Sequence, residues 1–424
     1  MSFNWKRIII LIIFILTVIL AGYLLYYLFL RPAVPTGPSG GGVGNVNTAP
    51  GGLPPTGTNV NIPIGGNING SLPGTNVSTS SQAIPPQAPT TGPTPTEVAN
   101  GGLTKSNQLT SVPAFQPTMT ADGTGVIYYD KTTGLFNKIG SDGKTTALSE
   151  KVFFEVQNIT WSPNRNKVVL EYPDGSNIVY DFQTGRQVSL PKHWKDFDFS
   201  PSGQQLVVKS MGDSEENRWL AVTNTDGSQA KKIEHLGDKD ASVYPSWSPN
   251  NQVIAMYTEY KNFDQQNLYF LGQNDENFKS TIIEGRGLQT KWSTKGDKLL
   301  YSVDSSTSNN KPTLWIVDAQ GENIGSNRQN LKIETWADKC TFADNATIYC
   351  AVPTSLPAAA GLFPDQADTS PTDIYKIDLA TGLRSKIATP SGDANIDSLM
   401  VSQDGNYLYF TNKTDGRLYN LRLQ

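Results

Sequence analysis

A short turn recurs seven times along this 424-residue chain and constrains its fold more than any other feature. Six copies begin with Ser or Thr, and a run of β-branched and aromatic residues follows each turn, as expected for a strand. The spacing between successive copies runs from 38 to 60 residues, and all but the last spacing lie in the range in which a repeat marks one supersecondary unit. The copies begin at Thr120, Ser162, Ser200, Ser248, Ser293, Phe342 and Ser402.

Each repeat contains enough residues for four strands. In the second repeat the strand after the turn is followed by another at Asn177–Phe182, a Gln183-Thr184-Gly185 turn and a further strand at Arg186–Leu190. With the strand that precedes the Ser-Pro turn, the unit has the four antiparallel strands of a β-propeller blade. Residues 103–424 are therefore predicted to form an all-β, seven-bladed β-propeller.

The seventh repeat lacks an outer strand, because the sequence ends just after the strand predicted at Leu418–Leu423. The segment Leu103–Thr110, just before the first repeat, has the pattern of the other outer strands. We expect this N-terminal strand to complete the last blade, which would close the ring and remove an exposed sheet edge.

This order of turns and strands resembles the TolB-like, WD-related propeller repeats of bacterial envelope proteins. The resemblance covers residues 103–424 and implies a propeller in the cell envelope. It implies little about activity, because propellers host many functions. The sixth repeat departs from the pattern, since Phe342 stands where the other copies have Ser or Thr.

Residues 8–30 form an uninterrupted run of 23 residues without a charged side chain. As a helix this run spans roughly 34 Å, enough to cross a bilayer core. Lys6 and Arg7 precede it, so residues 1–7 are predicted to be cytoplasmic and the propeller extracytoplasmic. A cleaved signal peptide is the alternative, but the apolar run is longer than such peptides use. We therefore predict a single-pass membrane protein with an uncleaved signal anchor.

Residues 31–102 are predicted to be a disordered linker. Between Pro32 and Thr96 the sequence has no Asp, Glu, Lys or Arg and is rich in Gly, Pro, Thr, Ser and Asn. Such a segment cannot bury enough apolar surface to fold. It would act as a tether that holds the propeller away from the membrane.

The only two cysteines, Cys340 and Cys350, flank a predicted turn at 343–346. Neighbouring antiparallel strands can bring such a pair to disulfide distance, which predicts a disulfide in an oxidising compartment. Two buried free thiols are the alternative. With only His193 and His235 besides, a zinc site is not expected, and we predict no metal or cofactor.

The formal net charge is −4, and residues 103–424 carry −6 of it against +2 for the N-terminal part. A basic surface patch is not expected from this balance, so we predict no nucleic-acid partner.

In a four-stranded blade the loops between the second and third strands and between blades share one face, here called the loop face. The short repeated turns share the other, the turn face. Long loops on a rigid scaffold commonly carry binding residues. We therefore predict that a protein or envelope component binds the loop face, which receives the long segments Met211–Arg218, Glu259–Gln266, Ser305–Pro312 and Pro353–Thr372.

The longest of these loops contains Leu362, Phe363, Pro364 and Asp365, our candidate partner-binding residues. Exposed apolar residues on a loop favour a contact with a partner. The alternative is that the loop folds back to cap the disc or plug its centre.

No Gly-x-Ser-x-Gly, phosphate-binding glycine loop or His-Glu-x-x-His motif occurs in the sequence, so we predict no catalytic residues. The first hypothesis is a non-catalytic binding or scaffolding module of the cell envelope. One alternative is a metal-dependent, lactonase-like propeller hydrolase with its site at the channel mouth. The other is a structural or sensory subunit of a membrane complex.

Overall fold

The computed structural model describes residues 16–17, 20, 94–276 and 278–424. The predicted cytoplasmic N-terminus and almost all of the predicted transmembrane helix and linker lie outside these residues. In the part of the chain described, no helix is long and apolar enough to cross a membrane. The unit Pro86–Gln424 is treated by itself below.

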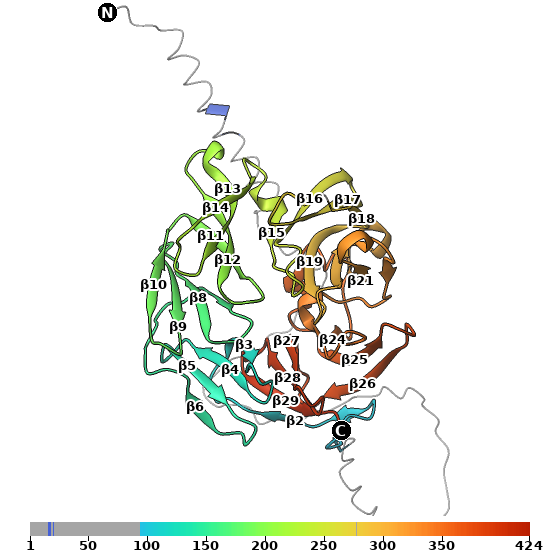
Figure 1. The fold of residues 1–424 in the computed structure, drawn as a ribbon. Helices are drawn as coiled ribbons and strands as arrows, with labels where there is room; N and C mark the ends of the chain where they lie inside the picture. Colours follow the sequence, from blue (N-terminus) through green and yellow to red (C-terminus); the bar gives the residue numbers. More distant parts are fainter. Residues whose placement is uncertain (1–15, 18–19, 21–93, 277) are drawn as a thin grey trace, which may run out of the picture. The chain divides into compact units, whose positions relative to one another are not determined.

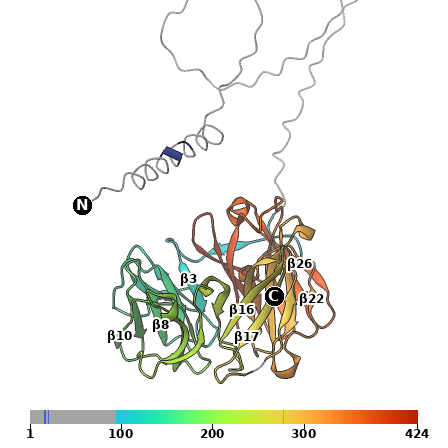
Figure 2. The same ribbon diagram turned by 90° about the horizontal axis from the view of Figure 1, so that it is seen from above.

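Seven sheets, antiparallel except for one added strand in blade 6, make up this unit, and the predicted all-β, seven-bladed propeller is confirmed. Figure 1 shows β3, β15, β19 and β27 towards the centre of the ring and β6, β10 and β26 at its periphery. Figure 2 views the blades from the side.

Blade 1 consists of β3 (Phe115–Met119), β4 (Val126–Asp130), β5 (Leu135–Ile139) and β6 (Thr145–Ala147), and blade 2 consists of β7 (Asn158–Trp161), β8 (Lys167–Glu171), β9 (Asn177–Asp181) and β10 (Gln187–Leu190). Blade 3 consists of β11 (Trp194–Phe199), β12 (Gln205–Met211), β13 (Arg218–Asn224) and β14 (Lys231–His235). Blade 4 consists of β15 (Val243–Pro245), β16 (Ala255–Asn262), β17 (Gln265–Leu271) and β18 (Thr281–Ile283).

Blade 5 consists of β19 (Arg286–Trp292), β20 (Lys298–Asp304), β21 (Pro312–Asp318) and β22 (Gln329–Asn330). Blade 6 consists of β23 (Cys340–Phe342), β24 (Thr347–Pro353), β25 (Thr372–Asp378) and β26 (Arg384–Pro390), with β1 (Leu103–Thr104) added at its outer edge. Blade 7 consists of β27 (Ile396–Val401), β28 (Tyr407–Asn412), β29 (Leu418–Arg422) and β2 (Ser106–Gln108). Short 3₁₀ turns lie in the loops: η2 (Glu215–Asn217), η3 (Asp240–Ser242), η4 (Ser306–Ser308), η5 (Gly321–Asn323), η6 (Ala337–Lys339) and η7 (Pro364–Ala367).

The repeated Ser or Thr holds each tight turn together through its hydroxyl group. In the fourth blade, Ser248 Oγ accepts a hydrogen bond from the backbone N–H of Val253 at 2.9 Å, and Ser248 N–H donates to Val253 O at 2.8 Å. Asn251 completes the turn with a φ of 62°, a conformation that Gly, Asn and Asp adopt most readily. Without the buried hydroxyl, the Val253 N–H would lack this acceptor.

The sixth turn uses a carboxylate in place of the hydroxyl. β23 ends at Phe342, and the shorter turn is closed by a hydrogen bond from Ala343 N–H to Thr347 O at 2.9 Å. Asp344 Oδ1 accepts the backbone N–H groups of both Ala346 and Thr347 at 2.7 Å. The departure of Phe342 from the repeat therefore leaves the four-stranded blade intact.

The N-terminal strand closes the ring, as predicted. β2 pairs antiparallel with β29, with Asn107 opposite Asn420, and Figure 1 shows it beside the last blade. The ladder continues beyond β2, because Leu109 N–H donates to Leu418 O at 2.8 Å and Leu418 N–H donates to Thr110 Oγ1 at 3.0 Å. The strand is shorter than the predicted segment Leu103–Thr110.

The preceding residues pair with a different blade. β1 runs parallel to β26 of blade 6, with Leu103 opposite Thr389. Upstream, Ala99 N–H donates to Arg422 O at 2.9 Å, and Thr96 forms a bridge with Thr104. Contacts with the propeller thus begin at Thr96, within the segment predicted to be linker.

The core consists of apolar layers between neighbouring blades. Val207 and Leu220 of blade 3, for example, pack with Ile254 and Ala255 of blade 4, and all four are buried. An apolar layer of this kind lies between every two neighbouring blades, so each blade is stabilised by both of its neighbours.

Candidate functional site

The long loop of blade 6, residues 354–371 between β24 and β25, is anchored at its centre to blade 5. Ala359 N–H donates to Asn309 O and Gly361 N–H donates to Asn310 O, both at 2.8 Å. Gly361 lies so close to β20 that an added Cβ would be 2.4 Å from Asp304 Cβ, which only glycine avoids. This loop is therefore fixed to its neighbour by backbone contacts.

The second half of the loop is anchored to blade 7. Asn395 Nδ2 donates hydrogen bonds to Ala367 O and Asp368 O at 3.2 and 2.5 Å. Asp368 also forms an ion pair with Lys413 at 2.6 Å. The loop consequently bridges blades 5 and 7 across the top of blade 6.

The two sides of this loop differ in character. Ala360 and Ala367 are buried against Trp336, so one side covers the blades as the capping alternative predicted. On the other side Leu362 and Phe363 are 43% and 58% exposed. Pro364 and Asp365, the first two residues of η7, are also exposed. The four candidate residues therefore lie together on the outer side of a capping loop.

A second group of exposed apolar residues lies on the loop face, at the tip of a hairpin in blade 4. The segment Glu259–Gln266 was expected to be a loop, but β16 and β17 continue through most of it as a tight hairpin. Its strand-forming residues pair across the turn, which explains why no long loop remains. Tyr260 and Phe263 at the tip are 70% and 63% exposed, and the Phe263 ring lies 4.0 Å from the Arg286 guanidinium carbon.

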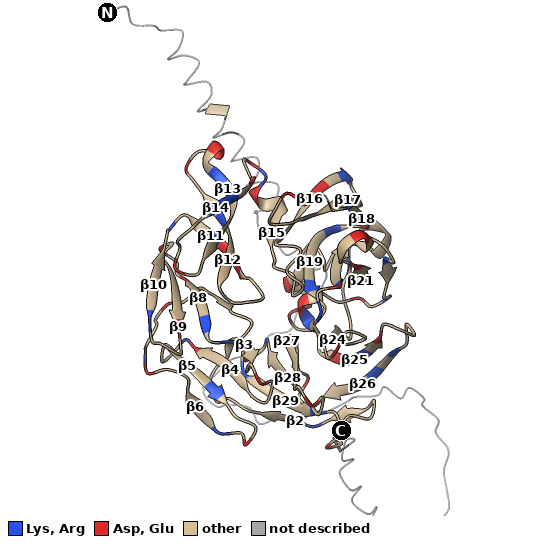
Figure 3. Cartoon of the chain, viewed as in Figure 1, with Lys and Arg blue, Asp and Glu red and all other residues tan. Residues whose placement is uncertain are grey.

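Charged side chains gather where blades 5 to 7 meet the centre of the ring. Lys291 on β19 donates a hydrogen bond to Cys340 O, and Lys339 on η6 donates to Ile396 O. Desolvation by the surrounding protein lowers the pKa of both lysines and raises the pKa of Asp338, which the negative charge of Asp397 raises further. Over the propeller as a whole, basic and acidic residues are interspersed (Figure 3).

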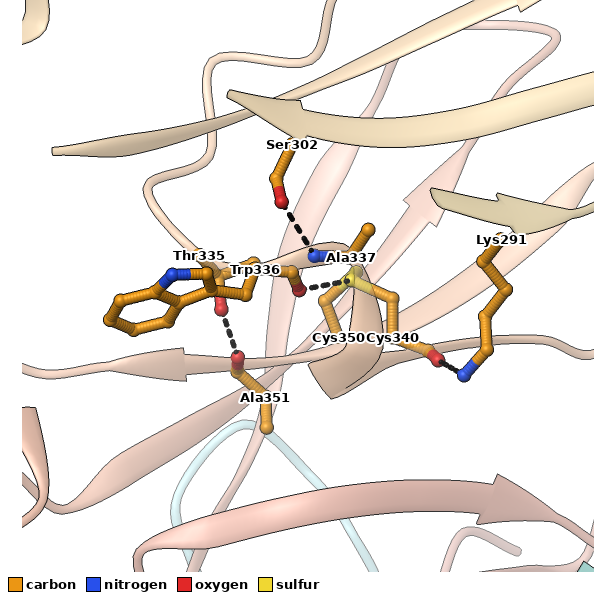
Figure 4. The surroundings of a disulfide bond; sticks show 8 residues. All are labelled: Lys291, Ser302, Thr335, Trp336, Ala337, Cys340, Cys350 and Ala351. Atoms are coloured by element: carbon orange, nitrogen blue, oxygen red, sulfur yellow. Dashed lines mark hydrogen bonds between the residues drawn. A yellow bond between two sulfur atoms is a disulfide. The ribbon is translucent and has the colours of Figure 1, made fainter. Parts of the chain in front are cut away.

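Cys340 and Cys350 are directly opposite each other on β23 and β24, and their sulfur atoms are bonded. Figure 4 shows this disulfide next to the segment that contains Trp336 and Ala337. Ala337 N–H donates to Ser302 Oγ at 3.0 Å, which ties the same segment to blade 5. The cross-link thus supports η6, the element that places Asp338 at the centre of the ring.

Among the described residues no group of three or more His, Cys, Asp or Glu side chains could hold a metal ion. His193 and His235 are both exposed.

The sequence interpretation missed the charged group at the ring centre. Asp338 and Lys339 precede β23 directly, and Asp397 is the single charged residue of the innermost strand β27. The sequence feature that could have indicated this group was a charged residue within the first strand of a blade. Its meaning depended on knowing which strand of each blade faces the centre.

No model of a known protein family matches the sequence, and no curated protein matches it. Among solved structures, the β-propeller domain of Cps50 (Swd1) from Myceliophteria thermophila is similar, with a TM-score of 0.51 and 10% identity over 75% of this chain and 100% of that chain. An oligogalacturonate lyase in complex with manganese gives a TM-score of 0.48 and 13% identity over 75% and 93% of the two chains. The tricorn protease gives 0.48 and 11% over 75% and 34%. At these identities the similarity is one of fold, and the fold is that of a β-propeller.

Proposed function

We propose that this chain is a membrane-tethered, extracytoplasmic β-propeller that acts as a non-catalytic binding or scaffolding module of the cell envelope, similar to TolB-like propellers. The uncharged apolar run at residues 8–30 supports the tether. The bonded pair Cys340 and Cys350 supports an oxidising compartment, because disulfides are rare in the cytosol.

The observation that carries the binding proposal is the exposure of Leu362 and Phe363 on a loop that is held at both sides. Adjacent exposed apolar side chains form a contiguous patch, which is a feature of interaction sites. Because the backbone of this loop is already ordered by blades 5 and 7, binding there would cost little additional conformational entropy.

The distribution of other exposed apolar residues supports the same face. Asp264, beside Phe263, accepts hydrogen bonds from the backbone N–H and hydroxyl of Ser306, which links the blade 4 hairpin to blade 5. Of the large hydrophobic residues exposed on the described propeller, only Leu383 lies on the turn face. Those in loop-face segments are Val152, Phe154, Tyr260, Phe263, Leu362 and Phe363.

The test is affinity purification of the full-length protein from its own membranes after mild cross-linking. The variant with both Leu362→Ser and Phe363→Ser should lose a partner that the wild type retains. Leu383→Ser is the matched control, because Leu383 is 66% exposed but lies on the opposite face. We expect it to retain the partner.

If no partner depends on residues 362 and 363, or if Leu383→Ser causes the same loss, the binding proposal is wrong. A partner that is recovered only when residues 8–30 are present would instead favour a subunit held in a complex through its membrane segment.

A further inference from the structure

A pocket of about 730 Å³ is lined by residues of blades 7, 1 and 2, and none of its lining residues belongs to the long loop. Its walls come from the innermost strands β3 and β7, and its far end comes from β27 and the loop after β28. This volume lies within the range of pockets that hold small ligands or a side chain of a partner. Phe115, Trp161 and Asp397 are among its lining residues.

The aromatic walls are held in place from behind. Trp161 stacks on Phe182 with ring centroids 5.7 Å apart and packs edge-to-face against Phe136 at 5.4 Å. Phe115 packs against Tyr129 at 6.3 Å. The rings therefore need no rearrangement to receive a flat group, which lowers the entropic cost of binding.

The pocket already places one cation on an aromatic ring. Lys131, another lining residue, holds its ammonium nitrogen 3.5 Å from the centroid of Phe115. Lys131 itself is exposed, so this contact is one that an incoming cation could replace. A positive charge over an aromatic ring is attracted by the negative face of its π-system.

The far end of the pocket presents a carboxylate. Asp397 is exposed and forms no ion pair within 4.0 Å in the described part of the chain. Lys413, which also lines the pocket, and Lys339 both interact electrostatically with Asp397, but neither forms an ion pair with it. Lys413 pairs with Asp368 at 2.6 Å, and Lys339 donates to Ile396 O. A ligand with a positive charge would complement Asp397, the one carboxylate among the lining residues.

We propose that this pocket receives an arginine side chain from an extended segment of a partner protein. Arginine suits this combination because its planar guanidinium stacks on aromatic rings and also pairs with a carboxylate. The proposal rests on the loop face being the binding face, and it defines the chemistry of the partner at that face.

Binding of the capped tripeptide acetyl-Gly-Arg-Gly-amide to the full-length protein in mild detergent tests the proposal. Saturation-transfer NMR titrations give its Kd, and the same peptide with citrulline, which is neutral and similar in shape, is the matched probe. We expect Asp397→Asn to weaken the arginine peptide by about threefold or more and to leave the citrulline peptide unchanged. Lys131→Gln should strengthen the arginine peptide, because it frees the Phe115 ring.

Asp393→Asn is the control, because it removes the same charge from an exposed residue outside the pocket. Equal binding of the two peptides, an unchanged Kd in Asp397→Asn, or an equal loss in Asp393→Asn would overturn the proposal. The peptide titrations and the purification of the variant altered at residues 362 and 363 test different claims and can fail independently. A partner that needs those residues but not Asp397 leaves the loop-face function standing and removes only the arginine pocket.

Discussion

Asp198 lies at the junction between blades 3 and 4, near the centre of the ring. Its carboxylate accepts hydrogen bonds from the backbone N–H of Trp247 at 2.6 Å and of Phe199 at 2.8 Å. These bonds favour the ionised form, but desolvation outweighs them and raises the pKa of Asp198 to about 6. A residue that joins two blades is thus also sensitive to pH.

Asp198 should make the fold less stable as the pH rises from 4 to 6. The folded protein keeps the proton up to about pH 6, whereas the unfolded chain releases it near pH 4, so the folded state binds more protons between these values. We expect the free energy of unfolding to fall by on the order of 1–2 kcal/mol over this interval because of Asp198.

Denaturant titrations of the wild type, Asp198→Asn and Asp213→Asn at pH 4.5 and 6.5 measure this effect. Asp198→Asn should lose that part of the pH dependence, and Asp213→Asn, at an exposed position, should keep it. A pH dependence in Asp198→Asn equal to that of the wild type would show that Asp198 does not titrate in this interval.

Single residues also mark what the sequence could and could not predict. Ser162, Ser200 and Ser248 correctly located the turns, because each needs a hydroxyl at one place in the repeat. Phe342 could not reveal that Asp344 takes over this role, since a carboxylate near a turn has several possible acceptor geometries.

At the scale of elements, residues 94–110 connect the two ends of the repeat array. β2 completes blade 7 and β1 extends blade 6, so this segment covers the outer edges of two neighbouring blades. The sequence predicted the first pairing from the missing strand. It could not predict the second, because β1 has only two residues and leaves no periodic pattern.

Proline at residue 109 should weaken the closure of the ring. Leu109→Pro removes the N–H that donates to Leu418 O, whereas Leu109→Ala keeps this hydrogen bond and removes only the side chain. Leu109→Pro should therefore lower the free energy of unfolding by about 1–3 kcal/mol more than Leu109→Ala does. Equal denaturation midpoints for the two variants would contradict a role for this pairing in stability.

Loop length alone was an unreliable guide to which loop-face segments are irregular. Glu259–Gln266 is rich in polar residues, as a loop is, but most of it continues as paired strands, because the ladder between β16 and β17 extends to Asn262 and Gln265. Pro353–Thr372 was correctly expected to lie between strands. Its two-sided packing depends on Trp336 and Asn395, which lie in the segments just before and just after blade 6 and could not be paired with the loop by spacing.

At the scale of the whole molecule, ring closure brings together residues from opposite ends of the propeller sequence. Phe115 in the first blade and Asp397 in the last line one pocket, although more than 280 residues separate them. A seven-blade prediction places these two blades side by side. It does not say which residues of the innermost strands face each other, because bulges shift the register in both β3 and β27.

The central claim is that the propeller lies outside the membrane with its N-terminus inside. A membrane-impermeant maleimide applied to intact protoplasts tests it, using single cysteines introduced as Ser141→Cys in an exposed turn and Ser2→Cys near the N-terminus. The native Cys340 and Cys350 are bonded to each other and should not react. We predict labelling of Ser141→Cys in intact protoplasts and of Ser2→Cys only after lysis. Labelling of Ser141→Cys only after lysis would contradict the account.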